Sequence, residues 1–124
     1  MIVDDAEISR LSAERVMRRL GTTTDWACNG VEALSLLEKL PFDGILIDGQ
    51  MPIMDGYETT RRIRLRELMT GANRLFIILA TGDSDHASRA MEAGMDASIQ
   101  KPIDETELLE TIARFGKCGG RRGV

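Results

Sequence analysis

Five side chains that could carry out phosphoryl chemistry directly follow short apolar runs of the chain. Asp4, Asp5 and Asp48 bear carboxylates, Thr81 bears a hydroxyl, and Lys101 bears an ammonium group. Clustered carboxylates repel one another unless a cation lies among them, and oxygen ligands suit Mg²⁺. The ammonium and the hydroxyl can bind phosphoryl oxygens, while one carboxylate serves as a nucleophile that becomes an acyl phosphate. These residue types indicate a site for Mg²⁺ and a phosphoryl group, with Asp48 as the best candidate for the nucleophile.

The apolar runs before these residues are typical of strands in a parallel sheet, and helical patterns alternate with them. Such alternation predicts an α/β fold: a flavodoxin-like, doubly wound, five-stranded parallel sheet in the order 2-1-3-4-5 with five helices. Side chains at the carboxyl ends of its strands meet in one crevice. Strands are expected over residues 1–3, 24–28, 42–47, 75–80 and 98–100, and helices over 6–20, 31–40, 55–69, 83–93 and 104–115.

Two details of these helices are open to a structural test. In the helix over 55–69, the spacing of Tyr57, Thr60, Ile63 and Leu68 favours one buried face. In the last helix, Asp104 followed three residues later by Glu107 fits an N-terminal cap. Residues 1–115 are predicted to form one domain, and residues 116–124, which lack an apolar face, a flexible tail.

Composition narrows the class of protein. The 124 residues have a net charge of −4, which argues against nucleic-acid binding by the domain. No apolar run approaches the roughly 18 residues of a membrane span, and no secretory signal opens the chain, so we expect no membrane contact. Cys28 and Cys118 are far apart, which favours a reduced, cytoplasmic setting over a disulfide framework or a zinc site. The single histidine, His86, is expected on the surface of a helix.

Each motif has a plainer interpretation when it is taken alone. Paired acids such as Asp4 and Asp5 often cap a helix, and Lys101 before Pro102 is compatible with a surface turn. Thr81 is equally compatible with a simple turn between a strand and a helix. These plain interpretations weaken when the motifs are taken together, because charges that are buried at one edge of a sheet need mutual compensation.

Four segments of the chain, in this order and at these distances, resemble the receiver domain of bacterial two-component response regulators. The resemblance covers about residues 1 to 115, and the residues of these motifs are most like those in receivers of hybrid histidine kinases. The segment from Asp48 to Gly56 is the most specific. The four segments are Val3-Asp4-Asp5, residues 47–56, Ala80-Thr81-Gly82 and Lys101-Pro102.

The resemblance implies a phosphoacceptor and a metal site. Asp48 would accept a phosphoryl group from a phosphohistidine on a histidine kinase or a histidine phosphotransfer protein. Asp5 and Asp48 would hold Mg²⁺ through their carboxylates, the backbone carbonyl of Gln50 would be a further ligand, and Asp4 would act through a metal-bound water. Gln50 and Asp83 would tune how fast water removes the phosphoryl group.

The resemblance also assigns roles around the phosphoryl group. Lys101 would bind one of its oxygens, and Thr81 would swing toward another and pull its loop inward. Gly82 would leave room for the group, Met51 would help to shape the loop after the phosphorylation site, and Pro102 would be a cis proline that aims the lysine. Phosphorylation would then change how a downstream protein target binds.

Two features depart from the family pattern. Receivers usually carry an aromatic residue shortly before the lysine, which reports phosphorylation to the output face, and Ser98 stands there in this chain. The first strand, 1–3, is also short. Nine residues follow Phe115, so we expect a single-domain receiver or a receiver excised from a hybrid sensor kinase, which acts through protein contacts.

Two alternatives stay open at this point. An atypical receiver would bind partners without phosphorylation, although such proteins usually lose one of the site residues. A Mg²⁺-dependent phosphatase that uses an aspartyl phosphate would need a second aspartate two residues after the nucleophile, where Gln50 stands. We therefore expect a signalling domain that catalyses only its own phosphoryl transfer and slow dephosphorylation, not an enzyme.

Overall fold

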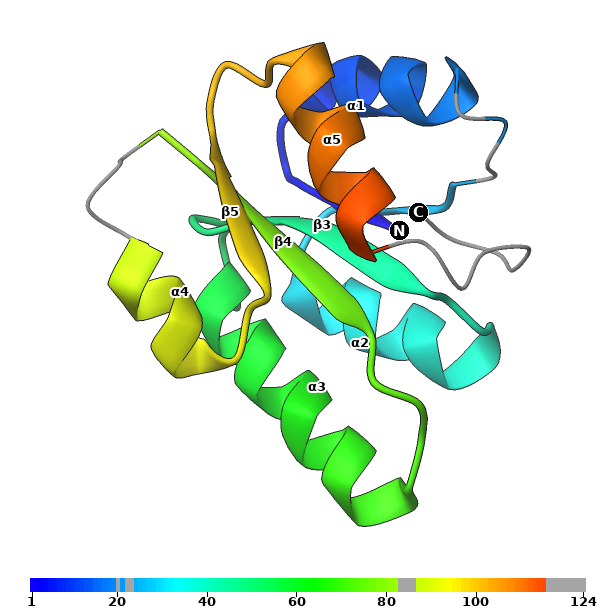
Figure 1. Ribbon diagram of the computed structural model, residues 1–124. Helices are drawn as coiled ribbons and strands as arrows, with labels where there is room; N and C mark the ends of the chain where they lie inside the picture. The colour runs from blue at the N-terminus through cyan, green and yellow to red at the C-terminus, as the bar shows by residue number, and fades with distance from the viewer. Residues whose placement is uncertain (20, 22–23, 83–86, 116–124) are drawn as a thin grey trace.

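The computed structural model describes residues 1–19, 21, 24–82 and 87–115 of the chain (Figure 1). Strands and helices alternate from one end of this part to the other. Their bounds are β1 (Ile2–Val3), α1 (Glu7–Arg19), β2 (Trp26–Ala27), α2 (Gly30–Lys39), β3 (Gly44–Asp48), α3 (Gly56–Thr70), β4 (Phe76–Thr81), α4 (Ala87–Ala93), β5 (Ala97–Gln100) and α5 (Glu105–Phe115).

The five strands form one parallel sheet in the order β2-β1-β3-β4-β5. The predicted flavodoxin-like topology is confirmed. The register places Val3 beside Ile47, Asp48 beside Ala80, and Thr81 beside Gln100. Because all five strands run in the same direction, the residues that follow β1, β3, β4 and β5 gather at one edge of the sheet.

Helices cover both faces of the sheet. Figure 1 shows α1 and α5 on one face and α2, α3 and α4 on the other. Each face has its own apolar core, which includes Ile45 and Ile77 on the α2–α3–α4 side and Leu46 and Ile78 on the α1–α5 side. β4 is buried along its whole length because both of its faces are covered, which explains its continuous apolar run. None of the helices in the described part of the chain is both long and apolar enough to cross a bilayer.

Local side-chain chemistry sets the helix ends. The carboxylates of Asp55 and Asp104 accept hydrogen bonds from the backbone N–H groups of Glu58 (2.8 Å) and Glu107 (3.0 Å), so the predicted cap at residue 104 is confirmed. At the other end of α3, Gly71 adopts φ 74°, a left-handed conformation that glycine adopts at little cost.

The prediction for the buried face of α3 is wrong at one position. Tyr57, Thr60 and Ile63 are buried, but the side chain of Leu68 is 82% exposed. Leu68 lies five positions after Ile63, which turns its side chain away from the sheet, whereas Glu67 lies four positions after Ile63 and faces inward. Glu67 is compensated there by Arg64, which lies 2.9 Å away.

Several boundaries also differ from the sequence prediction. β2 covers only two of the five predicted residues, and α3 begins at Gly56 because Asp55 is its cap. The helix expected over 83–93 is described from Ala87 onward, so His86 lies outside the described residues. The tail 116–124, including Cys118, lies outside them as well.

Candidate functional site

The sheet brings the five predicted residues to the same edge. Asp48 is the last residue of β3, Thr81 is the last residue of β4, and Lys101 directly follows β5. Asp4 and Asp5 directly follow β1, the neighbour of β3. Residues that are up to 97 positions apart in the sequence therefore surround one location.

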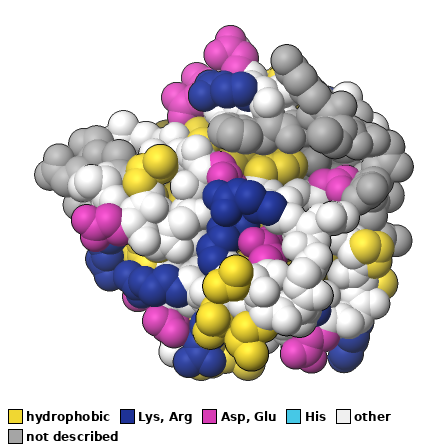
Figure 2. All heavy atoms as spheres, turned by 60° about the horizontal axis from the view of Figure 1, so that its bottom comes forward, with side chains coloured by type: hydrophobic (Ala, Val, Ile, Leu, Met, Phe, Trp, Pro, Cys, Tyr) yellow, Lys and Arg dark blue, Asp and Glu magenta, His cyan; other side chains and the backbone are white. Residues whose placement is uncertain are grey.

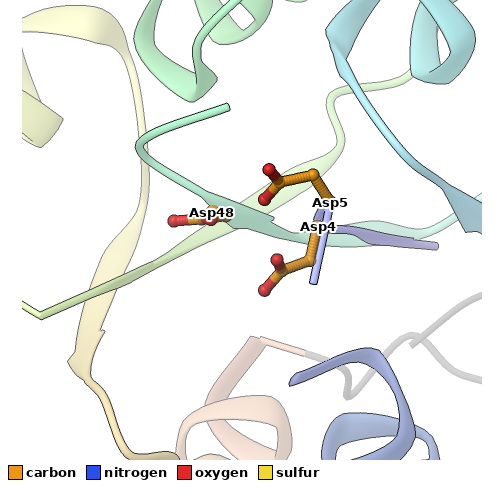
Figure 3. Close-up of side chains that lie close together, drawn as sticks. All are labelled: Asp4, Asp5 and Asp48. Carbon is orange, nitrogen blue, oxygen red and sulfur yellow. The ribbon is translucent and has the colours of Figure 1, made fainter. Parts of the chain in front are cut away.

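The three aspartates form a close group of carboxylates. One carboxylate oxygen from each of Asp4, Asp5 and Asp48 lies within 4.8 Å of the others. Figure 3 shows the three side chains projecting to the same side of the end of β1. Asp4 is buried, Asp48 is half-buried, and Asp5 is exposed, so solvent reaches the group from the side of Asp5.

Lys101 supplies the positive charge of the group. Its Nζ lies 3.0 Å from Oδ2 of Asp4 and 3.4 Å from Oδ2 of Asp48. The backbone N–H of Lys101 donates a 2.7 Å hydrogen bond to the carbonyl of Thr81, which ties the end of β5 to the end of β4. The peptide bond between Lys101 and Pro102 is cis, as the resemblance implies.

The surroundings shift the protonation of two of these groups. Burial raises the pKa of Asp48 and the charge of Asp4 adds to this rise, while the backbone N–H of Gln50 and the ammonium of Lys101 oppose it. Burial alone would lower the pKa of Lys101, but its hydrogen bond to Asp4 and the charges of Asp48 and Asp4 outweigh burial, so the pKa rises. The ionised form of Asp48 is thus less stable than that of an exposed aspartate.

The charge balance of the site fits a divalent cation. Three carboxylates face one ammonium group, so two negative charges stay uncompensated among these four side chains. All the available ligand atoms of the carboxylates are oxygens, which Mg²⁺ prefers. Both oxygens of Asp4 already accept hydrogen bonds, one from the N–H of Ala6 and one from Lys101, whereas Asp5 faces solvent. Asp5 is therefore better placed than Asp4 to bind a metal directly.

The loop after β3 is held tightly against Asp48. The backbone N–H of Gln50 donates a 3.2 Å hydrogen bond to Oδ1 of Asp48. A Cβ atom at Gly56 would lie 2.3 Å from the carbonyl oxygen of Asp48, so only glycine fits there. Within the loop, Ile53 adopts φ 73°, a conformation that is strained for a β-branched residue. Met51 is half-buried and packs against the core on the α2–α3–α4 side.

The remaining predicted residues lie at the ends of β4 and β5. Thr81 is buried, and Gly82 is exposed; among the described residues other than its chain neighbours, no atom lies within 4 Å of the position that a Cβ atom of Gly82 would take. The described residues thus leave space for a larger group beside Gly82. Asp83, the other residue predicted beside the phosphoryl group, lies outside the described residues.

Arg10 is a residue of this region that the sequence did not single out. Its Nη1 donates a 2.9 Å hydrogen bond to the backbone carbonyl of Asp4 and lies 3.6 Å from Sγ of Cys28, while its guanidinium lies 5.5 Å from the ring centre of Trp26. Arg10 thus fixes the backbone that carries the first two aspartates. α1 contains four arginines, and no sequence signal separates Arg10 from the others.

The family model for the response regulator receiver domain matches residues 1–113. The chain belongs to this family. This receiver is 37% identical over 119 residues to hybrid signal transduction histidine kinase E of Dictyostelium discoideum, and 37% identical over 121 residues to histidine kinase CKI1 of Arabidopsis thaliana. These matches cover 94% and 85% of the receiver, but only 7% and 11% of the two kinases.

Solved structures give the same family. The receiver is similar to the receiver domain of a sensor histidine kinase from Pseudomonas aeruginosa PAO1, with a TM-score of 0.81 and 30% identity. The similarity covers 92% of this chain and 93% of that one, which carries a magnesium ion in its active-site cleft. The chain is therefore a receiver domain of two-component signalling, as its motifs indicated.

Proposed function

We propose that this receiver is a phosphoacceptor switch that takes a phosphoryl group from a phosphohistidine onto Asp48. The observation that carries the proposal is the position of the Asp48 carboxylate, at the carboxyl edge of the sheet, beside two other carboxylates and 3.4 Å from the ammonium of Lys101. The donor is a histidine kinase or a histidine phosphotransfer protein, which agrees with the histidine kinases among the relatives.

The chain's own residues supply the positions that the transfer needs. A carboxylate oxygen of Asp48 forms a bond to phosphorus as the bond between phosphorus and the imidazole nitrogen of the donor breaks, and the electron pair of that bond stays on the nitrogen. Lys101, held between Asp4 and Asp48, balances charge on the phosphoryl oxygens. Thr81 offers a hydroxyl from the end of the adjacent strand. Such transfer depends mainly on position and charge.

Mg²⁺ is the proposed cofactor. When bound, it would neutralise negative charge on the phosphoryl oxygens. Asp5 and Asp48 would hold it together with the backbone carbonyl of Gln50, and Asp4 would contribute through a water. This assignment agrees with the exposure of Asp5 and with the two occupied oxygens of Asp4. The magnesium ion of the Pseudomonas aeruginosa receiver supports the same choice of metal.

The proposed output is a change in protein binding. A phosphoryl group on Asp48 adds charge and acceptor oxygens, which would draw Thr81 and the segment that leads into α4. A downstream protein would then bind the altered face, with no contact to nucleic acid or membrane. The receiver would catalyse only its own phosphoryl transfer and slow dephosphorylation. A cytoplasmic location stays a prediction from the sequence.

One observation favours a second candidate, an atypical receiver that binds partners without phosphorylation. Ser98, which stands where receivers usually carry an aromatic residue, is exposed on β5. An output that did not depend on phosphorylation would not need an aromatic side chain there. The four charged residues of the site argue for the first candidate, because an interaction module has no need for two uncompensated charges.

Intact-mass measurement after incubation with acetyl phosphate separates these candidates. We expect a gain of one phosphoryl group that requires Mg²⁺ and that is lost in Asp48→Asn. The matched control is Asp43→Asn, which removes a carboxylate just before β3, at the opposite end of that strand, and should leave the gain unchanged. A receiver that binds Mg²⁺ but never gains the phosphoryl group would contradict the proposal and favour the atypical receiver.

A further inference from the structure

Tyr57 lies between the residue that follows Asp48 and helix α4. Its side chain is 1% exposed, and its hydroxyl lies 3.3 Å from the position that a Cβ atom of Gly49 would take. On its other side, the guanidinium carbon of Arg89, in α4, lies 4.1 Å from the centre of the Tyr57 ring. The side chain of Tyr57 thus lies beside the start of the loop that follows Asp48, and a cation from α4 covers its ring.

The usual aromatic position offers no such link in this chain. Ser98 pairs with Leu79 in the register of β4 and β5, and its small side chain is exposed. Leu79 belongs to the apolar core beneath α4, together with Tyr57, Ala90 and Ala93. The aromatic ring beneath α4 is therefore supplied by α3 and not by β5.

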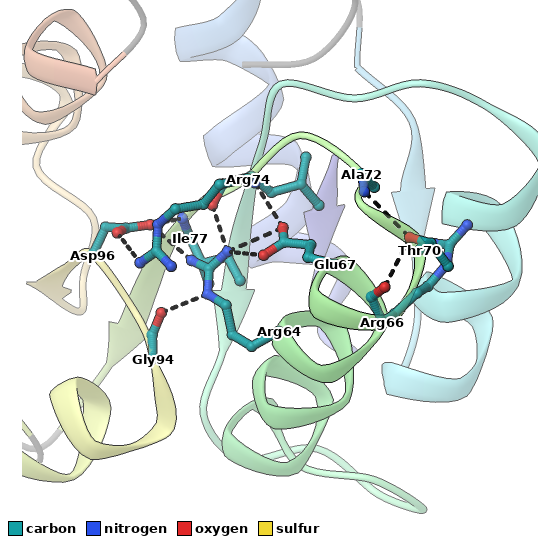
Figure 4. A network of polar contacts seen from close by, with 10 residues as sticks. Arg64, Arg66, Glu67, Thr70, Ala72, Arg74, Ile77, Gly94 and Asp96 are labelled. Carbon is teal, nitrogen blue, oxygen red and sulfur yellow. Dashed lines mark hydrogen bonds and ion pairs between the residues drawn. The ribbon is translucent and has the colours of Figure 1, made fainter.

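The far end of α4 is fixed by a separate group of charges, which we call the Arg64 network: Arg64, Glu67, Arg74 and Asp96. Nε of Arg64 donates a 2.9 Å hydrogen bond to the carbonyl of Gly94, directly after α4. Nη2 of the same side chain lies 2.9 Å from Asp96, just before β5 (Figure 4). These contacts hold the C-terminal end of α4, whereas the contact between Arg89 and Tyr57 lies in the N-terminal half of the helix.

We propose that Tyr57 and Arg89 couple Asp48 to α4, in place of the aromatic residue that is missing from β5. This inference rests on the proposed function. Phosphorylation changes the loop that begins at Gly49, which shifts the ring of Tyr57, and the cation of Arg89 follows the ring. Tyr57 and Arg89 are positioning residues, because neither touches the phosphoryl group itself. The relation is reciprocal, so a change at Arg89 also alters the surroundings of Asp48.

The chain allows a direct spectroscopic test because Tyr57 is its only tyrosine. Protein labelled with 3-fluorotyrosine gives one ¹⁹F resonance, which reports on this ring alone. We expect the resonance to move when acetyl phosphate and Mg²⁺ are added, and to stay in place in Asp48→Asn. Intact mass is measured on the same samples, so that phosphorylation and the movement of the ring are read separately.

Variants of Arg89 test the second contact. Arg89→Gln removes the cation; the resonance should start at a different position and lose most of its movement on phosphorylation. Arg89→Lys keeps the cation and should restore most of that movement. Arg61→Gln is the matched control, since Arg61 is an exposed arginine on α3 whose partner is Glu58, and it should behave as the unmodified protein.

The possible results separate the two proposals. A phosphorylated protein with an unmoved resonance would overturn the role of Tyr57 and leave the proposed function intact. Equal movement in Arg89→Gln and the unmodified protein would overturn the role of Arg89. Absence of any gain in mass would reject the proposed function, and the coupling would fall with it.

Discussion

Two charge clusters lie at opposite ends of the same strands, and they are built differently. The site at the carboxyl edge groups three carboxylates and has one ammonium group, which pairs with two of them. The Arg64 network, at the other edge, matches two arginines with two carboxylates at distances of 2.8 to 2.9 Å. β5 separates the two, with Asp96 just before it and Lys101 just after it.

Backbone hydrogen bonds sharpen this contrast. In the Arg64 network, the carboxylates of Glu67 and Asp96 accept from the backbone N–H groups of Leu75 (2.7 Å) and Ile77 (2.8 Å), and Arg64 donates to two carbonyls. The network joins α3, β4 and the turn after α4 (Figure 4). The balanced cluster is hydrogen-bonded to the backbone of several elements and so stabilises the fold, whereas the carboxylate cluster has two uncompensated negative charges, which a bound cation would neutralise.

The same contrast extends to the backbone. Near the Arg64 network the left-handed conformations belong to glycines, Gly71 (φ 74°) and Gly94 (φ 102°). At the carboxyl edge a left-handed conformation belongs to Ile53 (φ 73°), although its side chain is 80% exposed and gains little from packing. The backbone is therefore strained at the end of the sheet that carries the site and relaxed at the other end. This agrees with a functional role for the first end and a stabilising role for the second.

The surface near α3 shows that charge and apolar side chains are mixed on this side of the molecule. Leu65, Leu68 and Met69 of α3 are exposed. On the face that Figure 2 brings forward, hydrophobic side chains lie beside basic and acidic ones. The Arg64 network differs from such surface charges because the side chain of Arg64 is only 14% exposed.

The largest effect is expected from Arg64→Met, which would break the stabilising cluster. Removing Arg64 takes away the cation that compensates Glu67 and leaves Asp96 with Arg74 alone, so the free energy of unfolding should fall by about 3 kcal/mol. Urea denaturation measures this change. The control is Arg62→Met, since Arg62 is an exposed arginine of α3 that pairs with Glu58 at 2.9 Å, and it should cost less than about 1 kcal/mol. Equal losses in the two variants would contradict the structural role of the network.

Mg²⁺ should act on the other cluster only. At a free concentration about tenfold above its dissociation constant, it should raise the free energy of unfolding by about 1.4 kcal/mol, because it binds the folded state. Arg64→Met should retain this gain, while Asp5→Asn should lose most of it. An undiminished gain in Asp5→Asn would show that the ion binds elsewhere.

Ile53→Asn tests whether the loop of the site stores strain. Asparagine adopts left-handed conformations more readily than a β-branched residue, so stability should rise by about 1 kcal/mol. Thermal or urea denaturation would detect this, with Ile53→Val as the control that keeps a β-branched side chain. A stability loss in Ile53→Asn would mean that the isoleucine is favourable where it stands.

The smallest effect is expected from Asp48→Asn without metal. Because burial raises the pKa of Asp48 above its ordinary value of 3.8, the folded state binds this proton more tightly than the unfolded state does. The contribution of this carboxylate to stability therefore falls as the pH rises from below 3.8 through the folded-state pKa. Asp48→Asn should be more stable than the unmodified protein at pH 7, by less than about 1 kcal/mol, and the difference should vanish at low pH. A difference that grows as the pH falls would contradict burial as the cause of the shifted pKa.

The sequence alone predicted the residues of the site at the carboxyl edge, but not the Arg64 network. The strand-end positions of Asp48, Thr81 and Lys101 follow from apolar runs and a parallel sheet, and the alternation of strand and helix patterns predicted the flavodoxin-like order of that sheet. The Arg64 network could not be predicted from the sequence. Its residues are up to 32 positions apart, and their contacts depend on how α3 packs against the sheet. The wrong assignment of Leu68 had a different origin, because its spacing of five positions from Ile63 already departs from the helical period; only the inward position of the charged Glu67 needed the packed structure.

Finer features of the site were out of reach for similar reasons. The sequence does not reveal that Lys101 already lies 3.0 Å from Asp4, that Arg10 holds the carbonyl of Asp4, or that Arg89 covers Tyr57. Each contact joins different elements through flexible side chains, whose directions are set by packing and not by local pattern. The bounds of β2 were hard to predict for another reason. It is a two-residue strand at the edge of the sheet with one exposed side chain, so its sequence has no apolar run that marks where it begins and ends.

The most direct test of the central claim is to trap the acyl phosphate and locate it. Borohydride reduces a phosphorylated aspartate to homoserine, which peptide mass spectrometry assigns to one position. After treatment with acetyl phosphate and Mg²⁺, we predict homoserine at position 48 and none when Mg²⁺ is left out. Homoserine at position 4 or 5, or its absence from every position, would contradict the assignment of Asp48 as the phosphoacceptor.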